Sequence, residues 1–461
     1  MKRAIPLSLA ALPLLITILL LLLLVFVVKL PLYLGLLSGA VLAAIIAYKH
    51  DFTLPELRQA AFAGIKNTQT VVIILLTIGA LVAVWMGSGT VAGLVYYGLG
   101  LVHPGYILVS AFILTALTSM LLGTSIGTLS TMGVALMGIG FSLGVPKPLI
   151  AGAVVSGAFF GDRSSPMSSA AHLASTATEV EFNKMLRYML PTGGLGFGLS
   201  LIGYYILGNV YRPAATGVLG LSLPAELAKY FTISPLVLLP ALLVILLAVG
   251  KVPTKYNLGL GVIAGILVAF WVQKMPVPEL ARALAFGYKA NSGNPTIDAM
   301  VKGGGILPML NLILLILSAG AFNGILSATG MIKQVAEKLL QGVKSDSGII
   351  VATVLFSTAT ALVACNQALP ILMPGQMLRS FYQERRLANL TLARTLTDSG
   401  LVISGLVPWN MVAILSSMAI GVSTLEYAPY ALLLWLLPLL TILFAYFAQP
   451  KRVIQDPPGA K

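Results

Sequence analysis

The sequence predicts an all-α, polytopic membrane protein with roughly 11–13 transmembrane helices. Three observations favour this class. Of the 461 residues, 58% are hydrophobic and only 9% are Asp, Glu, Lys or Arg, whereas an ordinary soluble domain has about 25% charged residues. The apolar residues gather in long runs, and the chain has a single Cys. These features exclude soluble globular, disordered and disulfide-stabilised proteins.

The first helix is expected in the apolar run 4–28, which follows two basic residues. This run is longer than the ~7–15 residues of a signal-peptide core, so we expect it to be retained. The run 30–48 then returns the chain to a basic loop. The positive-inside rule places these basic segments, and both termini, on the cytoplasmic side of a bacterial-type inner membrane. The basic residues concerned are Lys2, Arg3, Lys49, Arg58, Lys66, Lys451 and Arg452.

The net charge of +14 has the same explanation, because Lys and Arg are scattered between apolar runs and form no patch for nucleic acid. Further apolar runs follow at 71–85, 106–122, 132–143, 149–160, 188–207, 235–249, 258–272, 306–326, 348–364, 401–420 and 430–447. The stretches 92–102 and 223–231 fit interfacial or partial helices.

The longest polar connection, 274–302, is the expected boundary between two halves. The predicted organisation is an N-terminal helix pair with its loop at 1–69, a first repeat at 70–273, a polar connection at 274–304, a second repeat at 305–448 and a tail at 449–461.

Four apolar segments are interrupted by short polar stretches, two in each half. The first half has interruptions at 123–131 and 156–166, and the second half has them at 364–370 and 404–410. Interrupted segments in corresponding places of two halves are typical of transporter sites, because irregular backbone is tolerated at membrane depth only where it is buried or lines a cavity. Aligning Ser156-Gly157 with Ser404-Gly405 places Asp162 on Asn410.

Two acidic residues, Asp162 and Asp398, adjoin these interruptions, whereas most other carboxylates lie in loops or at segment ends. A charged carboxylate at the bilayer centre costs about 3 kcal/mol or more, so it needs a partner or a function. A carboxylate can bind either a proton or a small cation, but it binds the two poorly at the same time. Competition of this kind provides an exchange mechanism.

Hydroxyl and amide oxygens near the two acids are suitable ligands for an alkali cation or a substrate. The candidates are Thr124, Ser125, Thr128, Ser165, Ser168, Ser399, Asn366, Gln367 and Asn410. Other interpretations stay open: Asp162 and Arg163 can form a local ion pair, Asp398 can cap a helix, and each hydroxyl can bond back to its own helix.

The runs Gly123-Thr-Ser-Ile-Gly-Thr128, Gly161-Asp-Arg-Ser-Ser-Pro166 and Val407-Pro-Trp-Asn410 resemble signature segments of the NhaC-type sodium/proton antiporters, in the wider ion transporter superfamily. The resemblance extends from about residue 70 to residue 446. It implies two inverted repeats with re-entrant hairpins and broken helices, in a homodimer whose transport domains move against a scaffold. It also implies that Asp162, Ser165 and Ser168 form the ion-site segment, with Asp398 and Asn410 as its second-half counterpart.

The sequence departs from the family pattern after Pro166. Many members have a second acid and an amide where this chain has Ser169 and His172. One carboxylate then carries the segment alone, which affects the expected stoichiometry and the choice of substrate. His172 is either a proton relay or a satisfied interfacial residue.

Other classes of function have weaker support. Gly123-Thr-Ser-Ile-Gly127 formally matches a hydrolase nucleophile motif, with His172 as a conceivable base, but this region offers no strand-to-helix elbow. His50, His103 and His172 have no metal-ligand spacing, and Cys365 is expected to be a buried, inert thiol. Repeated filter residues of a channel are absent from the sequence.

We therefore expect a secondary active transporter and not an enzyme, with Na+ and H+ as the transported ions and no cofactor. In the expected cycle, Na+ and H+ compete for Asp162, and Asp398 either balances charge or carries the proton. The expected partners are the lipid bilayer and a second copy of the chain. The alternative is exchange or symport of a small organic anion or amino acid, such as malate or lactate, with Arg163 or helix N-termini meeting its carboxylate.

Overall fold

The computed structural model describes residues 5–28, 30–98, 104–211, 225–250, 252–292, 298, 301–332, 334, 335, 343 and 345–447. Helices make up nearly all of this part of the chain, as predicted. The strands β1 (Tyr288–Lys289) and β2 (Lys302–Gly303) form one short antiparallel pair. The predictions that concern residues 1–4, His103 and the tail 449–461 lie outside the described residues.

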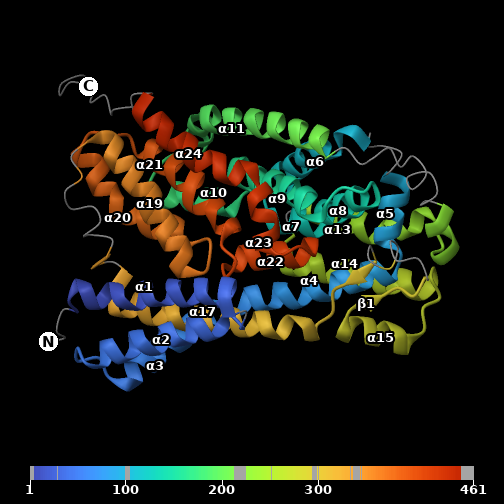
Figure 1. The fold of residues 1–461 in the computed structure, drawn as a ribbon, viewed down its shortest axis with the longest axis horizontal. Coiled ribbons are helices and arrows are strands. Elements are labelled where there is room, and N and C mark those ends of the chain that lie inside the picture. Colours follow the sequence, from blue (N-terminus) through green and yellow to red (C-terminus); the bar gives the residue numbers. More distant parts are fainter. Residues whose placement is uncertain are drawn as a thin grey trace.

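The helices form two layers (Figure 1). The first layer holds α1 (Leu7–Leu23), α2 (Tyr33–Tyr48), α3 (Leu54–Lys66), α4 (Gln69–Gly87), α14 (Thr254–Trp271), α15 (Val277–Phe286) and α17 (Leu310–Thr329). The second layer holds α6 (Ile107–Leu122), α7 (Ser125–Thr128), α8 (Val134–Ser142), α9 (Lys147–Ser164), α10 (Ser169–Thr178), α11 (Phe182–Val210), α19 (Asp346–Ala364), α20 (Leu369–Glu384), α21 (Asn389–Leu396), α22 (Met411–Ile420), α23 (Thr424–Tyr427) and α24 (Leu432–Phe447). Each predicted repeat thus contributes to both layers.

Two helices lie near one end of the molecule and contact both layers. These are α5 (Thr90–Gly98), which packs on α4 and α8, and α13 (Leu239–Val249), which packs on α14 and α6. These two helices, together with the packing of α4 on α22, join the layers, while most of each layer is built from its own helices.

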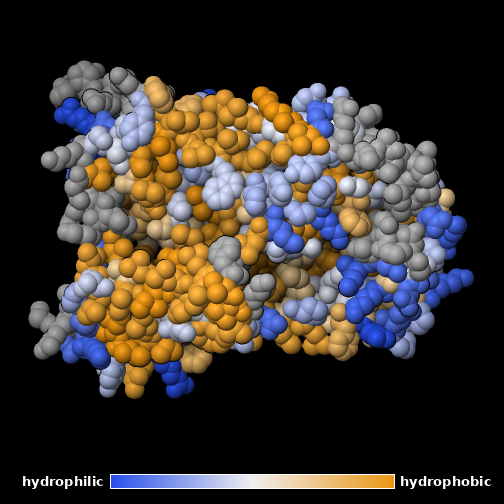
Figure 2. Space-filling view, viewed as in Figure 1, coloured by the Kyte–Doolittle hydropathy of each residue, from blue (hydrophilic) through white to orange (hydrophobic). Residues whose placement is uncertain are grey.

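Six helices of the described chain are long and apolar enough to cross a membrane, and eight if each of two bent pairs counts as one span. Four shorter apolar helices bring the number into the range predicted from the sequence. Apolar side chains cover much of both layers, and hydrophilic ones gather at the two ends of the molecule and in a patch near its middle (Figure 2). This distribution is what a bilayer requires of a multi-pass protein.

Small residues allow the helices to approach closely. Gly64 of α3 faces Gly320 and Gly324 of α17 so tightly that a side-chain carbon there would overlap the partner backbone. On α9, Gly157 and Gly161 face α6 in the same way. The four-residue spacing of the α9 pair places both glycines on one face of the helix, a common device of membrane helix packing.

The four predicted interruptions are helix breaks. In the first half, α6 ends at the left-handed Gly123 and α9 is separated from α10 by residues 165–168. In the second half, α19 ends at the left-handed Cys365, and α21 continues through η6 (Thr397–Leu401) and η7 (Ser404–Leu406) before a break at 407–410. The segments on the two sides of this last break differ in direction by 56°.

The run 401–420, predicted as one apolar segment, is therefore divided near Pro408. Proline has no amide hydrogen to donate and disfavours helical geometry in the residue before it, so the helix ends there. The Asn410 side chain then caps α22 by accepting a hydrogen bond from the Val412 amide. Helices α3, α10, α20 and α21 are additional to the apolar runs read from the sequence.

Candidate functional site

Asp162 lies in the last turn of α9, directly before the first-half break, and is buried. The Ser125 hydroxyl donates a hydrogen bond to Oδ2 at 2.8 Å, and the Ser168 hydroxyl donates one to Oδ1 at 2.8 Å. The Gln367 amide approaches the same carboxylate from the second half of the chain. Both helix breaks of the first half and one of the second half therefore meet at this carboxylate.

The local sequence explains why these hydroxyls reach Asp162. Thr124 caps α7 and thereby orients Ser125, the first residue of that short helix. Ser168 caps α10 by accepting a hydrogen bond from the Ala171 amide, while its own proton goes to Asp162. Ser165 fixes the break itself, because its hydroxyl donates to the Met120 carbonyl at 2.6 Å. Ser165 therefore positions the segment and is not seen to contact Asp162.

Asp398 has a different environment. It lies in η6, is fully buried, and its Oδ1 forms an ion pair with Nε of Arg163. Its Oδ2 accepts a hydrogen bond from the Thr441 hydroxyl at 2.8 Å. The alternative in which Arg163 pairs with its neighbour Asp162 does not describe this structure, because adjacent residues on a helix point in different directions.

The Arg163 guanidinium is held on every side. Its Nη2 donates to the Met189 carbonyl at 3.2 Å and to the Thr192 hydroxyl at 3.0 Å, both on α11. Gly193 leaves room for the group, since a side-chain carbon there would lie 2.6 Å from Nη1. Arg163 is thus fully engaged and is not presented to a ligand.

Asp162 and Asp398 are the buried acidic residues of the described chain. Within that part of the structure, Asp398 has a buried cationic partner and Asp162 has none. The neutral hydroxyl partners of Asp162 are hard oxygen groups that can contact a cation while they remain near the carboxylate.

The remaining candidate residues mostly stabilise the breaks. Thr128 and Ser399 bond back to carbonyls of their own helices, at 2.8 Å and 2.6 Å. Asn366 Oδ1 accepts a hydrogen bond from the Leu369 amide at the start of α20, and its Nδ2 donates to the Ala364 carbonyl at 3.0 Å. Gln367 is the amide of the second-half break that faces Asp162. Asn410 caps α22 and is not among the residues that contact the Asp162 carboxylate.

The hydrolase interpretation finds no pairing between Ser125 and His172. Ser125 is bonded to Asp162, whereas His172 is exposed, lies 3.1 Å from the Pro166 carbonyl and stacks on Phe182. Cys365 is completely buried, as expected. The described chain contains no group of three or more His, Cys, Asp or Glu side chains arranged to hold a metal ion.

A cavity of about 990 Å³, here called the polar cavity, lies between the two layers next to this site. It is lined by residues of α3, α4 and α17 on one side and of α7, α10, α20 and α22 on the other. Gln367 lines the cavity and also faces Asp162, so it connects the two. The polar residues that line the cavity are Asn67, Thr68, Ser169, Asn323, Ser327, Asn366 and Gln367.

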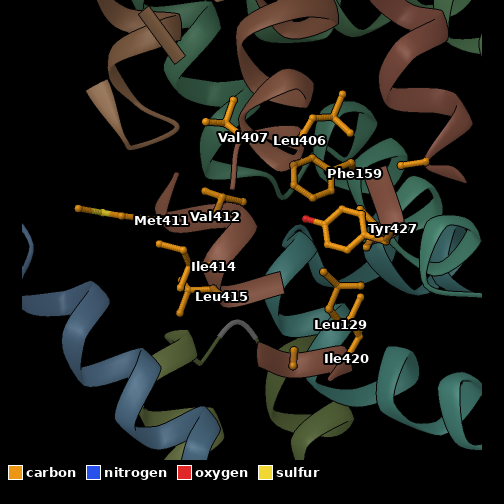
Figure 3. Close-up of a cluster of buried hydrophobic side chains, with 14 of the residues drawn as sticks. Leu129, Phe159, Leu406, Val407, Met411, Val412, Ile414, Leu415, Ile420 and Tyr427 are labelled. Carbon is orange, nitrogen blue, oxygen red and sulfur yellow. The ribbon is translucent and has the colours of Figure 1, made fainter. Parts of the chain in front are cut away.

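A second cavity, of about 620 Å³, lies farther along the same helices. On α4 the polar cavity reaches Ile74 and the second cavity begins at Val82, which corresponds to about 12 Å of helix. Helix α22 lines both cavities, and around it lies a cluster of buried apolar side chains that we call the apolar barrier (Figure 3). It contains Leu129, Phe159, Leu406, Val407, Met411, Val412, Ile414, Leu415, Ile420 and Tyr427.

The barrier is tied to the second-half break. The Tyr427 hydroxyl donates to the Gly405 carbonyl at 2.6 Å, and Phe159 occupies the space beside Gly405. Met411 and Val412 line the polar cavity, whereas Ile414 and Ile420 line the second cavity. The helix α22 therefore has one cavity at each of its ends and the barrier along its length.

One residue in the polar cavity was not identified from the sequence. Asn323 lies in α17, and its side-chain oxygen is buried with no hydrogen-bond partner. The available signal was an amide inside the apolar run 306–326. Asn323 lies within a continuous helix, whereas the sequence signals of this site are interruptions of helices.

Comparison with known proteins identifies relatives over nearly the whole chain. The model of a family described as the Na+/H+ antiporter family matches residues 4–209 and 157–449. The chain is 34% identical to the Na(+)/H(+) antiporter NhaC of Alkalihalophilus pseudofirmus, over 91% of each chain. It is 29% identical to the malate-2H(+)/Na(+)-lactate antiporter of Bacillus subtilis, over 90% of this chain and 89% of the relative. It is 30% identical to the arginine/ornithine antiporter ArcD of Halobacterium salinarum, over 93% and 88%.

Proposed function

The chain belongs to the Na+/H+ antiporter family, and we propose that it exchanges Na+ for H+ across the membrane, with Asp162 as the group that the two ions share. The observation that carries this proposal is the environment of Asp162. It is the buried carboxylate of the described chain that has hydroxyl partners and lacks a buried cation.

The chemistry follows from the cost of burying charge. A buried carboxylate is stable when it is neutralised, and either a proton or a small cation can do this. Ser125 and Ser168 donate to the charged carboxylate and can turn their oxygen lone pairs toward a bound Na+. The Gln367 amide adds a third hydrogen-bond donor to the carboxylate, from the second half of the chain. Release of Na+ and uptake of H+ then become alternatives at one site.

We assign Asp398 to charge balance. Its ion pair with Arg163 joins the first-half break to η6, and Thr441 adds a contact from α24. A carboxylate that is already neutralised by a buried guanidinium has no need of a proton or a cation. The ion pair therefore keeps the two halves in register around Asp162 and does not exchange ions.

Two cavities separated by the apolar barrier support an alternating-access cycle. In this proposal, the second layer carries Asp162 and moves against the first layer, so that the site communicates with one cavity at a time. The family resemblance adds the expectations of inverted repeats and a homodimer, and the distribution of basic residues adds the expectation of cytoplasmic termini in a bacterial-type inner membrane. The boundaries 70–273 and 305–448 remain our prediction for the repeats.

A small organic substrate is the second candidate. The polar cavity of about 990 Å³ is far larger than a bare ion needs, and relatives are named as antiporters of malate and lactate or of arginine and ornithine. Arg163 is engaged by Asp398 and α11, so it is a poor partner for a substrate carboxylate. The N-terminal residues Ser169 and Leu369 of α10 and α20 line the cavity and are better placed for such a contact.

The test is proton flux in proteoliposomes that contain a pH-sensitive dye. Na+, Li+, K+, malate, lactate, arginine and ornithine are added singly, to the wild type and to Asp162→Asn. We expect Na+ or Li+ alone to move protons and Asp162→Asn to abolish the flux while the protein stays folded in detergent. Flux driven only by an organic acid or amino acid would favour the second candidate, and Na+-driven flux in Asp162→Asn would contradict the role of this residue.

A further inference from the structure

We propose that Asn323 is an oxygen ligand for the cation on its path between the polar cavity and Asp162. This inference rests on the proposed function and extends it, because it adds a selectivity residue from the first layer. Asn323 lies on α17, whereas Asp162, Ser125 and Ser168 belong to the second layer.

The geometry of the Asn323 amide supports this role. Its Nδ2 donates to the Ala364 carbonyl at the end of α19, which fixes which side of the amide carries the oxygen. The side chain is only 7% exposed, and Oδ1 has no hydrogen-bond partner. An unpartnered buried acceptor costs about 1–3 kcal/mol. The residue lines the polar cavity, and Oδ1 itself is covered by neighbouring atoms, so a cation that entered from the cavity and displaced those neighbours slightly would remove this cost.

Other oxygen atoms at this end of α19 are already in use. Each carbonyl from residue 361 to residue 366 accepts a hydrogen bond. The donors are Asn410 to Ala361 and Asn366, Trp409 to Leu362, the Cys365 thiol to Val363, Asn323 and Asn366 to Ala364, and the Met411 amide to Cys365.

The end of a broken helix commonly offers its carbonyls to a cation in transporters. Here each of those carbonyls already accepts a hydrogen bond, and Asn366 Oδ1 accepts one from the Leu369 amide. The unfilled oxygen beside them is Asn323 Oδ1. We therefore infer that the side chain of Asn323 takes the place of the helix-end carbonyls.

The hydrogen bond from Asn323 to Ala364 also joins the two layers. Because Asn323 belongs to α17 and Asp162 to α9, a movement of the second layer would separate them. Asn323 would then contribute to cation binding in the conformation in which the polar cavity is accessible, and leave the ion when the layers move.

The experiment compares Asn323→Ala, Asn323→Asp and the control Ser327→Ala. Ser327 lies one turn farther along α17 and lines the same cavity. The Na+ concentration that gives half-maximal flux is measured in proteoliposomes, and the Na+-induced rise in Tm is measured in detergent as an independent readout of binding. Removal of an oxygen ligand is expected to raise the half-maximal concentration about 10-fold in Asn323→Ala.

Asn323→Asp retains a side-chain oxygen and loses the donor to Ala364, so it separates the two roles. A ligand role predicts that Asn323→Asp binds Na+ as well as the wild type or better, while Asn323→Ala binds weakly and Ser327→Ala is unchanged. The inference is wrong if Asn323→Ala has wild-type Na+ dependence, or if both Asn323 variants lose Na+ binding to the same extent. If the wild type neither binds Na+ nor exchanges it, the proposed function itself fails.

Discussion

Each half of the chain buries one aspartate beside a helix break, but the two aspartates have different hydrogen-bond and charge partners. Asp162 in the first half is surrounded by serine hydroxyls, whereas Asp398 in the second half is neutralised by Arg163. The serine hydroxyls are neutral, so the negative charge of Asp162 is not balanced by a side chain. The Arg163 guanidinium balances the negative charge of Asp398. If our proposal is correct, burial alone does not identify the exchanging group, and the partner of each carboxylate does.

The breaks themselves also differ between the halves. In the first half, the hydroxyl of the capping residue Ser168 donates a hydrogen bond to the carboxylate, so one side chain belongs to both the break and the site. In the second half, the capping residues Asn366 and Asn410 bond mainly to backbone carbonyls. In our proposal, the first-half break therefore forms the ion site, and the second-half break holds the structure around it.

The largest expected effect concerns the ion pair. Asp398→Asn leaves the Arg163 guanidinium buried without a counter-charge, which typically costs about 3–5 kcal/mol. We expect a large fall in Tm and in the yield of folded protein. Asp162→Asn leaves no buried cation without a counter-charge, so the Tm of this variant should stay near that of the wild type. The measurement is thermal unfolding in detergent, followed by size-exclusion chromatography.

The double variant Asp398→Asn with Arg163→Gln serves as the control for this prediction. It removes both charges, so it should recover part of the stability lost in the single variant. A Tm loss in Asp162→Asn as large as that in Asp398→Asn would contradict the comparison, because both carboxylates would then be structural.

A second prediction tests the left-handed residues that end α6 and α19. Gly123 has φ 66°, and a side-chain carbon there would lie 2.5 Å from the backbone of Met167. Gly123→Ala combines left-handed strain with overpacking, at a cost of about 2–4 kcal/mol. Cys365→Ala keeps the existing backbone conformation and removes only one buried sulfur, so its cost should be below about 1 kcal/mol.

The readout for this pair is again Tm, together with proton flux. We expect Gly123→Ala to lose flux as well, because Met167 lies next to the cap residue Ser168 that contacts Asp162. Equal Tm values for Gly123→Ala and Cys365→Ala would show that the first-half break tolerates a side chain and is less constrained than the geometry indicates.

The sequence was sufficient to predict the helical class and the helix breaks. Long apolar runs identify helices that face lipid, and polar interruptions identify the places where those helices end. Helices α10 and α21 were missed for the converse reason: they are short, rich in Ser and Thr or charged residues, and buried among other helices. Their polar faces meet protein, which a hydropathy pattern does not reveal.

The site was predicted only in part, because its partners are far apart in sequence. Arg163 and Asp398 are separated by 235 residues, and no local pattern predicts that they meet. Aligning the Ser-Gly pairs of the two halves placed Asp162 on Asn410. In the structure, Asp162 precedes its break and Asn410 follows its own, so Ser168 is the residue that occupies the equivalent capping position.

The smallest expected effect separates hydroxyls that contact the carboxylate from hydroxyls that do not. Ser125→Ala removes a donor to Asp162, whereas Ser399→Ala removes a buried hydroxyl that bonds only to the Thr395 carbonyl of its own helix. A hydrogen bond to a charged group contributes about 1.5–3 kcal/mol, so we expect Ser125→Ala to raise the half-maximal Na+ concentration about 10-fold.

Ser399→Ala is the matched control, since it is the same change at an equally buried position of the other half. Its half-maximal Na+ concentration should remain within about twofold of the wild type, because the back-bonded hydroxyl contributes nothing to the carboxylate. Equal shifts in the two variants would mean that Na+ responds to packing near either break. A shift confined to Ser125→Ala would tie Na+ binding to the first half, where the carboxylate has hydroxyls and no guanidinium.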